Sequence, residues 1–368
     1  MPKPLEYCLL SSTIPMLHDG DKTARTSLDE ATTLNIFFFY TCFNHTQPPL
    51  CDNDQDFSLC PSECPDKFLC TEDSVFELLA KLDTSKSTGS DGICSRMLKC
   101  IAACITPELC RLFNLSIFSG IFSTDWKLGR ITLIPNGTNS SLPSGYRPIS
   151  VLPIANKLIE RHVKLIVEDH LRENSPISTK QWGFMSSCSM VSALIRVIDD
   201  WLYALDQGYE VCAVFFDVSK AFDSVPHLAL LSKLSELGLD PYLLWWIRSY
   251  LSNRSQCVSI DGVDSHVLPV ASGVPQGSVL GPLLFILYIN DVATALSTES
   301  EMNMFADDVA LYIYRVIKSS IDYSHLQNDI NSISDCVKSK YLQFNTNKCK
   351  VMLVIKRGII QYNPRNCV

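Results

Sequence analysis

Apolar side chains recur at helical spacing in several parts of the chain. After Thr71, the apolar residues Val75, Leu78, Leu79 and Leu82 lie one to four positions apart on a single helical face. Thr71 is suited to be the N-cap, because its hydroxyl can accept a hydrogen bond from the first turn. By the same reasoning, further helices are predicted over 96–105, 108–120, from 154 after Pro153, from 227 after Pro226, and over 240–251, 278–296 and 326–337.

Shorter apolar runs, bounded by turn residues, predict strands. One run extends from Val211 to Phe216 and ends in Asp217, and the stretch 303–314 reads as two strands joined at Asp307 and Asp308. Further strands are expected over 129–135 and 350–355, and a hairpin over 256–270 around the turn "DGVD". Helices and strands alternate irregularly, which favours an α/β or α+β fold over a strict βαβ series.

The first 70 residues differ from the rest of the chain. They are rich in Thr, Asp, Pro and Cys and lack sustained periodicity, so we expect residues 1–70 to be an irregular leader or a linker remnant. The apolar runs at 34–40 and 280–289 are shorter than the roughly 20 residues that span a bilayer. No signal-peptide pattern opens the chain, so we expect an intracellular protein, in nucleus or cytoplasm, with free thiols and no membrane contact.

Composition is that of a globular protein, with 46% hydrophobic and 19% charged residues among 368. The net charge of -8 at first argues against a nucleic-acid partner. Its distribution changes that picture, because residues 126–181 hold eight basic and four acidic residues whereas the flanking parts are acidic. A phosphate backbone could bind this basic segment, although an ordinary solvated surface explains the charge equally well. The sequence indicates no oligomeric state.

The adjacent carboxylates Asp307 and Asp308 are the main candidate for chemistry. Two like charges about 4 Å apart repel by roughly 4 kcal/mol at an effective dielectric near 20. A third carboxylate, Asp217, ends an apolar strand, and hard divalent cations would offset the repulsion if the three met. Because side chains alternate along a strand, we expect Asp307 to be the main ligand and Asp308 an auxiliary one. Isolated "DD" pairs are more often exposed turn residues.

Six sequence blocks, in order, resemble the reverse transcriptase of non-LTR (LINE-type) retrotransposons. The resemblance covers roughly residues 72–357, most of the chain, and the six blocks read "SKSTGSDGI", "GYRPISVLPIANKLIERHV", "FFDVSKAFDSV", "SGVPQGSVLGP", "FADDVALY" and "LQFNTNKCKVML". The resemblance implies an α+β right-hand polymerase fold, with an antiparallel palm sheet backed by helices and the thumb largely absent. Residues 71–125 are then a helical N-terminal extension to the fingers, and residues 126–368 the fingers and palm.

The resemblance also implies a reaction and its cofactor. The chain would be an RNA-directed DNA polymerase that extends a DNA 3′ end on an RNA template with deoxynucleoside triphosphates. Asp217, Asp307 and Asp308 would be the catalytic carboxylates. Together with the carbonyl of Val218 they would hold two Mg²⁺ ions, which Mn²⁺ can replace.

Five further residues match the family's nucleotide-binding positions. The resemblance makes Phe222 the bulky residue that excludes a ribose 2′-hydroxyl, and places Gln276 and Gly277 along the incoming nucleotide. Arg147 would grip the triphosphate through its planar, permanently charged guanidinium. Lys348 would lie near the pyrophosphate leaving group as a general acid. Asp223, in the same block as Phe222, is expected to cap the following turn rather than act in catalysis.

Departures from the family pattern leave other functions open. Asn136 stands where the family usually has a fingers lysine, and losing that cation is expected to weaken triphosphate binding by about 1–3 kcal/mol. No endonuclease block precedes the palm and no Cys/His knuckle follows it, so a truncated, inactive nucleic-acid-binding remnant is the main alternative. An RNA-synthesising palm polymerase is another, against which Phe222 and "ADD" in place of "GDD" weigh.

Overall fold

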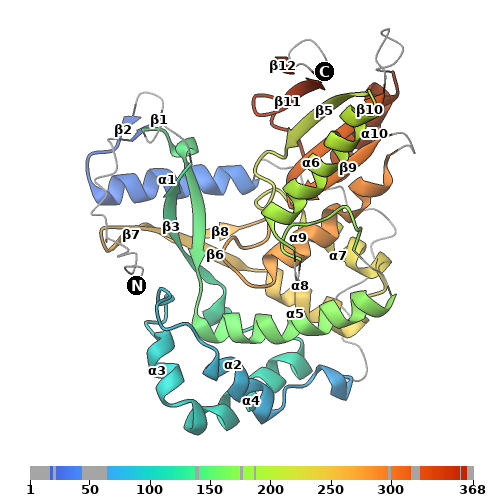
Figure 1. Ribbon diagram of the computed structural model, residues 1–368. Coiled ribbons are helices and arrows are strands. Elements are labelled where there is room, and N and C mark those ends of the chain that lie inside the picture. The colour runs from blue at the N-terminus through green and yellow to red at the C-terminus, as the bar shows by residue number, and fades with distance from the viewer. Residues whose placement is uncertain are drawn as a thin grey trace, which may run out of the picture.

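The computed structural model describes residues 17–19, 22–43, 64–136, 141–174, 177–185, 188–296, 300–315, 324–356 and 358–362. They form two five-stranded β-sheets, one two-stranded sheet and a set of helices (Figure 1). The first sheet, which we call the palm sheet, has five strands in the order β12-β11-β5-β10-β9. Its strands are β5 (Glu210–Asp217), β9 (Glu301–Phe305), β10 (Asp308–Arg315), β11 (Lys350–Ile355) and β12 (Gly358–Tyr362), and every pairing is antiparallel.

Strand β5 lies at the centre of the palm sheet and is buried on both faces. Val211 and Ala213 pack against α6 (Met190–Asp206), which covers one face in Figure 1. The alternate residues Cys212, Val214 and Phe216 belong to the main core on the other face, together with α10 (Ser324–Ser339). Covering on both faces is why this strand reads as a continuous apolar run instead of an alternating one.

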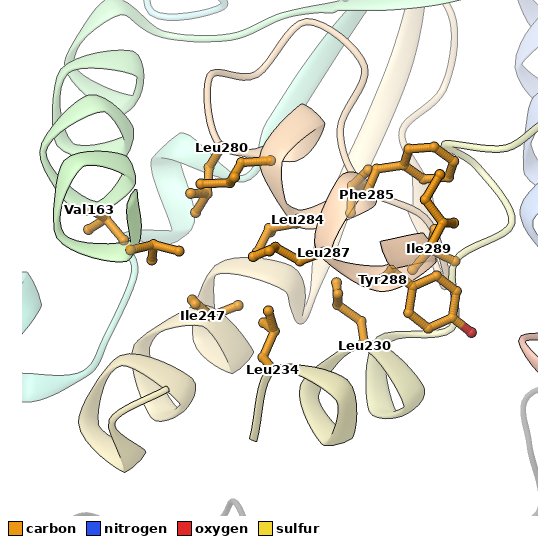
Figure 2. Packing of buried hydrophobic residues seen from close by; sticks show 14 of the residues in the cluster. Val163, Leu230, Leu234, Ile247, Leu280, Leu284, Phe285, Leu287, Tyr288 and Ile289 are labelled. Carbon is orange, nitrogen blue, oxygen red and sulfur yellow. The ribbon is translucent and has the colours of Figure 1, made fainter. Parts of the chain in front are cut away.

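Much of the main core comes from α5 (Ile154–Asn174), α7 (His227–Glu236), α8 (Pro241–Leu251) and α9 (Gly281–Ile289). Figure 2 shows Leu284 and Leu287 of α9 near Leu230 and Leu234 of α7, with Ile247 of α8 alongside. These side chains are at most 3% exposed. Helix α9 is apolar on all sides because it is buried on all sides. The predicted helix over 278–296 is therefore correct in its centre, and it continues as a 3₁₀ turn over Asn290–Thr294.

A second sheet, which we call the fingers sheet, has the order β4-β3-β6-β7, with β8 also paired to β6. Its strands are β3 (Leu128–Pro135), β4 (Tyr146–Val151), β6 (Arg254–Ile260), β7 (Val263–Asp264) and β8 (Leu268–Val270). Strands β3 and β6 pair in parallel, although the paired residues, such as Leu128 and Ser255, are 127 positions apart in the sequence. β4 is an edge strand, and an edge accepts Pro148, which has no backbone N–H. The strand predicted over 129–135 and the hairpin around "DGVD" are confirmed.

The N-terminal helices pack below the fingers sheet in the view of Figure 1. They are α2 (Glu72–Ala80), α3 (Ser95–Cys100) and α4 (Ala102–Ser119). Thr71 caps α2 as predicted, in a capping box with Ser74. The single helix predicted over 96–105 is wrong, because the backbone leaves helical geometry at Ile101, which ends α3, and α4 begins at Ala102.

The prediction of an irregular leader over 1–70 is wrong for residues 27–43, which form the helix α1 (Ser27–Phe43). Leu34 and Phe38 of α1 pack against Val258 and Ile260 of the fingers sheet. Asn35 is 1% exposed and accepts a hydrogen bond from Gln256 of β6. The helix escaped prediction because apolar side chains surround much of it, so its sequence lacks the polar face that reveals a helical period.

The remaining short elements are β1 (His18–Asp19), β2 (Lys22–Thr23) and 3₁₀ turns at Asp66–Phe68, Thr124–Trp126 and Pro143–Gly145. The α+β class is confirmed, because the chain combines helices with two large sheets and does not follow a regular βαβ order. In the ranges that the structure describes, no helix combines the length and the apolarity that crossing a membrane requires. The intracellular location stays a prediction.

Candidate active site

The carboxylates predicted to act together meet at one end of the palm sheet. Asp217 is the last residue of β5, and Asp308 is the first residue of β10. The antiparallel register pairs these two residues directly. The third carboxylate, Asp307, lies in the turn that joins β9 to β10. Residues about 90 positions apart in the sequence are therefore neighbours, as the resemblance implied.

The turn before β10 has an unusual backbone. Ala306 has a φ of 58°, in the left-handed region that residues with a side chain rarely adopt. This conformation takes the chain from β9 into β10 within two residues and leaves Asp307 outside the ladder. Successive side chains in a strand point to opposite faces of the sheet, but Asp307 lies outside the strand and does not follow this rule. The two adjacent carboxylates can therefore both interact with Asp217.

Negative charge is concentrated at this end of the sheet. Burial, followed by repulsion from Asp308 and Asp217, raises the pKa of Asp307 to about 6. Burial and repulsion from Asp217 also raise the pKa of Asp308, although Lys348 and Arg147 oppose the shift. Both shifts therefore mean that burial first, and repulsion between the carboxylates second, make the ionised forms of Asp307 and Asp308 costly in the folded protein.

Lys348 forms an ion pair with one of these carboxylates. Its Nζ lies 3.1 Å from Oδ1 of Asp217, and its side chain is half exposed. The backbone brings Lys348 there, because the amide of Asn345 donates to the carbonyl of Asp217 and the amide of Lys348 to the carbonyl of Asn345. The resemblance placed Lys348 near the leaving group, and the structure places it in the same cleft, paired with Asp217, one of the carboxylates predicted to be catalytic.

A cleft of about 550 Å³ separates the palm sheet from the fingers sheet at this point. Its walls include the palm carboxylates, the β4 strand of the fingers and the C-terminal part of α1. Of the nine predicted site residues, eight line the cleft: Arg147, Asp217, Val218, Phe222, Gln276, Asp307, Asp308 and Lys348.

Phe222 forms part of the cleft wall and is supported from behind. Its ring stacks on the buried ring of Phe285 in α9, with centroids 4.7 Å apart and an interplanar angle of 22°. Phe184 meets it edge-on at 6.2 Å. A side chain held on two sides has little freedom to move away from a bound sugar, which suits the predicted discriminating role.

Gln276 is held by two hydrogen bonds that leave part of its amide available. Its side-chain Nε2 donates to Oδ1 of Asp223 at 2.8 Å, and its backbone carbonyl accepts from the backbone amide of Ser150 at 2.7 Å. Burial raises the pKa of Asp223 to about 6, partly offset by that hydrogen bond and by Lys220. Asp223 was expected to cap a turn, and its side chain instead contacts a predicted nucleotide-binding residue.

Gly277 does not line the cleft, unlike the other predicted residues. Its φ is 99°, and a Cβ there would lie 2.5 Å from the carbonyl oxygen of Ser150. The glycine therefore allows the loop to approach β4, which fixes the position of Gln276 relative to the fingers sheet. Gly277 was predicted to let the backbone come close to the incoming nucleotide. In this structure it lets the backbone come close to Ser150 of β4.

Arg147 and Asn136 face the cleft from the fingers sheet. Arg147 is exposed on β4, and its charge opposes the raised pKa values of Asp307 and Asp308. The amide of Asn136 donates to the carbonyl of Gly145 at 2.7 Å, which closes the end of the β3-β4 pair. Asn136, which stands where the family usually has a lysine, therefore lines the cleft but brings no positive charge to it.

The donor set suits a hard divalent cation. Three carboxylates offer oxygen ligands, which Mg²⁺ prefers, and the raised pKa values mark charge that a cation would offset. Within the described ranges, no three His, Cys, Asp or Glu side chains are gathered closely enough to hold an ion as they stand. Lys348, which is paired with Asp217, would compete with a cation for that carboxylate.

Sequence reasoning missed the contribution of α1 to the cleft. Phe37, Phe38 and Thr41 line it, and Lys220 donates from the palm to the hydroxyl of Thr41 at 2.8 Å. The Nζ of Lys220 also lies 4.8 Å from the centroid of the Phe37 ring. The run "LNIFFFY" was the available signal, since so many aromatic residues are unusual in a leader without structure.

A family model decides the assignment. The model described as "Reverse transcriptase (RNA-dependent DNA polymerase)" matches residues 134–366, more than half of the chain. The chain belongs to the reverse transcriptase family. The matched range includes every predicted site residue and both sheets from β4 onward, but it excludes α1.

Relatives of this reverse transcriptase chain come from transposable elements. It is 34% identical over 241 residues to the probable RNA-directed DNA polymerase from transposon X-element of Drosophila melanogaster. That match covers 64% of this chain and 26% of the X-element protein. It is 29% identical over 336 residues to the RNA-directed DNA polymerase from mobile element jockey of the same organism, covering 88% of this chain and 36% of that protein. The chain thus spans about a third or less of these relatives.

Among solved structures, apo telomerase from Candida Tropicalis truncated from its C-terminal domain has a TM-score of 0.46 and 13% identity. The match covers 73% of this chain and 58% of that one. This likeness is too low to bear on function.

Proposed function

We propose that this reverse transcriptase chain extends a DNA 3′ end on an RNA template by adding deoxynucleotides. The observation that supports this most is the direct pairing of Asp217 with Asp308, beside Asp307, in a cleft between the two sheets. The proposed partners are an RNA template, a DNA primer and deoxynucleoside triphosphates. We also propose that residues 71–125 extend the fingers, and that 126–368 hold fingers and palm.

Two Mg²⁺ ions, or Mn²⁺ in their place, would be held by Asp217, Asp307, Asp308 and the carbonyl of Val218. Metal ions in polymerases of this kind activate the attacking hydroxyl and neutralise charge on the transferred phosphate. The protein must keep the three carboxylates ionised and close together, which lowers the free energy of unfolding. Binding of the ions to the folded state would raise it again.

The other cleft residues would bind and orient the substrates. Arg147 is placed on β4 to contact the triphosphate through its exposed guanidinium. Phe222, held by Phe285, would occupy the space of a 2′-hydroxyl. Lys348 would release Asp217 and donate a proton to the departing pyrophosphate. Most of the rate enhancement would come from positioning and electrostatic stabilisation.

A second candidate is a folded chain that binds nucleic acid without catalysis. It is favoured by Asn136, which leaves the cleft without the cation expected there, and by the ion pair that holds Lys348 on Asp217. An RNA-synthesising enzyme is disfavoured because Phe222 is packed too firmly to make room for a ribose.

A nucleotide incorporation assay separates these functions. Poly(rA)/oligo(dT) is incubated with Mg²⁺ and either dTTP or UTP, and the duplex is also titrated in a filter-binding assay. We expect weak dTTP incorporation and about 100-fold less UTP incorporation. Preferred use of UTP would overturn the choice of substrate. Tight duplex binding without incorporation at any enzyme concentration would establish the non-catalytic function instead.

A further inference from the structure

Residues 180–183 lie beside the strand that leads into the catalytic turn. Gln181 forms a parallel bridge with Met304 of β9. The amide of Trp182 donates to the carbonyl of Met304 at 2.8 Å, and the amide of Met304 donates to the carbonyl of Lys180 at 2.8 Å. This short segment therefore extends the palm sheet beyond β9, immediately next to the Asp307 turn.

The side chain of Gln181 reaches the turn itself. Gln181 is 5% exposed, and its Oε1 accepts hydrogen bonds from the amide of Gly183 at 2.8 Å and from the amide of Ala306 at 3.0 Å. The second bond spans 125 residues of sequence. Ala306 is itself 3% exposed, so water is a poor substitute for this acceptor.

Ala306 needs such a partner because its backbone is strained. Its φ of 58° is unfavourable for a residue with a Cβ, and such conformations persist only where the surroundings impose them. Gly183 makes the contact sterically possible, since a Cβ there would lie 2.3 Å from the backbone nitrogen of Ala306. The glycine and the glutamine act on the same amide.

We propose that Gln181 is a positioning residue for Asp307, acting through the Ala306 amide. The hydrogen bond fixes the left-handed turn, and the turn fixes where the Asp307 carboxylate lies relative to Asp217. This inference deepens the proposed function and rests on it for the role of Asp307, but the link between Gln181 and the turn does not depend on catalysis.

The neighbouring residue supplies a matched control. Trp182 belongs to the same segment, and its Nε1 donates to Oδ1 of Asn303 in β9 at 2.9 Å. Lys180 adds an ion pair with Glu301. Loss of the Gln181 side-chain bond should therefore free the turn without releasing the segment. Trp182→Phe removes a side-chain bond from the segment without touching the turn.

The test combines hydrogen exchange with kinetics in Gln181→Met, Trp182→Phe and wild type. Met has a similar length but lacks a strong acceptor. In Gln181→Met we expect amide exchange in a peptide covering 303–308 to be about tenfold faster, with β3 unchanged. Primer extension should lose about 10- to 100-fold in kcat, whereas KM for dTTP stays within about threefold. Trp182→Phe should leave exchange at the turn and kcat near wild type.

Three results would overturn the proposal. They are unchanged exchange over 303–308 in Gln181→Met, faster exchange that extends equally to β3, and a loss carried by KM alone. The second would make Gln181 a general stability residue. If wild type extends no primer, the proposed function fails, but the exchange comparison still decides whether Gln181 holds the turn.

Discussion

Asp308 at the start of β10 is the direct cross-strand partner of Asp217 at the end of β5. Like charges directly opposite one another destabilise an antiparallel pair. A chain that folds only for stability would gain by replacing one of them. This pairing is therefore the clearest structural sign that the palm sheet is built around a function that needs negative charge.

Asp308→Asn should stabilise the protein in the absence of divalent ions. Removing one of the opposed charges is expected to raise the free energy of unfolding by about 1 kcal/mol. Urea denaturation in EDTA measures it. Asp335→Asn is the control, because Asp335 is 80% exposed and only loosely paired with Lys338. Added Mg²⁺ should stabilise wild type more than Asp308→Asn, and a destabilised Asp308→Asn would contradict the explanation.

Asp223 should make stability depend on pH. Its folded-state pKa of about 6 lies above the ordinary value near 3.9, so the folded protein binds the proton more tightly than the unfolded chain. Stability contributed by the protonated form is therefore complete below about pH 4 and is lost as pH rises through about 6. Asp223→Asn, which can still accept from Gln276, should remove this loss.

The difference in unfolding free energy between Asp223→Asn and wild type is the quantity to follow. It should grow by about 2–3 kcal/mol between pH 4 and pH 7, in favour of the variant. Taking the difference cancels other groups that titrate in both proteins. A difference that stays constant over this range would show that the carboxyl of Asp223 is not destabilised by its burial.

Gly277→Ala should damage the contact between the nucleotide loop and β4. Both the φ of 99° and the 2.5 Å approach to the carbonyl oxygen of Ser150 oppose a methyl group. Gly262→Ala is a matched control, because Gly262 has a φ of 79° but open space around it. Thermal denaturation should show a cost of about 1 kcal/mol for the control and about 3 kcal/mol for Gly277→Ala. Equal costs would mean that the close approach carries no energy.

Phe222→Val should relax the choice of sugar. The smaller side chain opens the space proposed to exclude a 2′-hydroxyl, so the ratio of kcat/KM for dTTP over UTP should fall about 10- to 100-fold. Phe76→Val is the control, because Phe76 is exposed on α2 and does not line the cleft. Unchanged selectivity in Phe222→Val would remove that residue from its proposed role.

Local patterns predicted the elements that carry the three carboxylates proposed to be catalytic. The buried run Val211–Phe216 and the hairpin around Asp307 have strong short-range signals, and the structure has both. Pairing between β3 and β6 could not be predicted, because parallel partners far apart in sequence leave no local pattern. Helix α1 was missed because its apolar residues surround the helix instead of marking one face.

The site itself was predicted in its residues but not in their support. Motif matching found Gln276 and Asp307, but it did not reveal that Gln276 bonds to Asp223 or that Ala306, next to Asp307, bonds to Gln181. Both supports are single side-chain hydrogen bonds between segments distant in sequence. Such bonds depend on the finished fold, and a lone buried Gln or Asp carries no signal of its partner in the sequence.

Primer extension by site variants tests the central claim that Asp217, Asp307 and Asp308 act as one catalytic site. Wild type, Asp217→Asn, Asp307→Asn and the exposed control Asp335→Asn are assayed on poly(rA)/oligo(dT) with dTTP and Mg²⁺. We predict weak incorporation by wild type and control, and a loss of about 100-fold or more in either site variant. Extension that survives in Asp307→Asn would contradict the account.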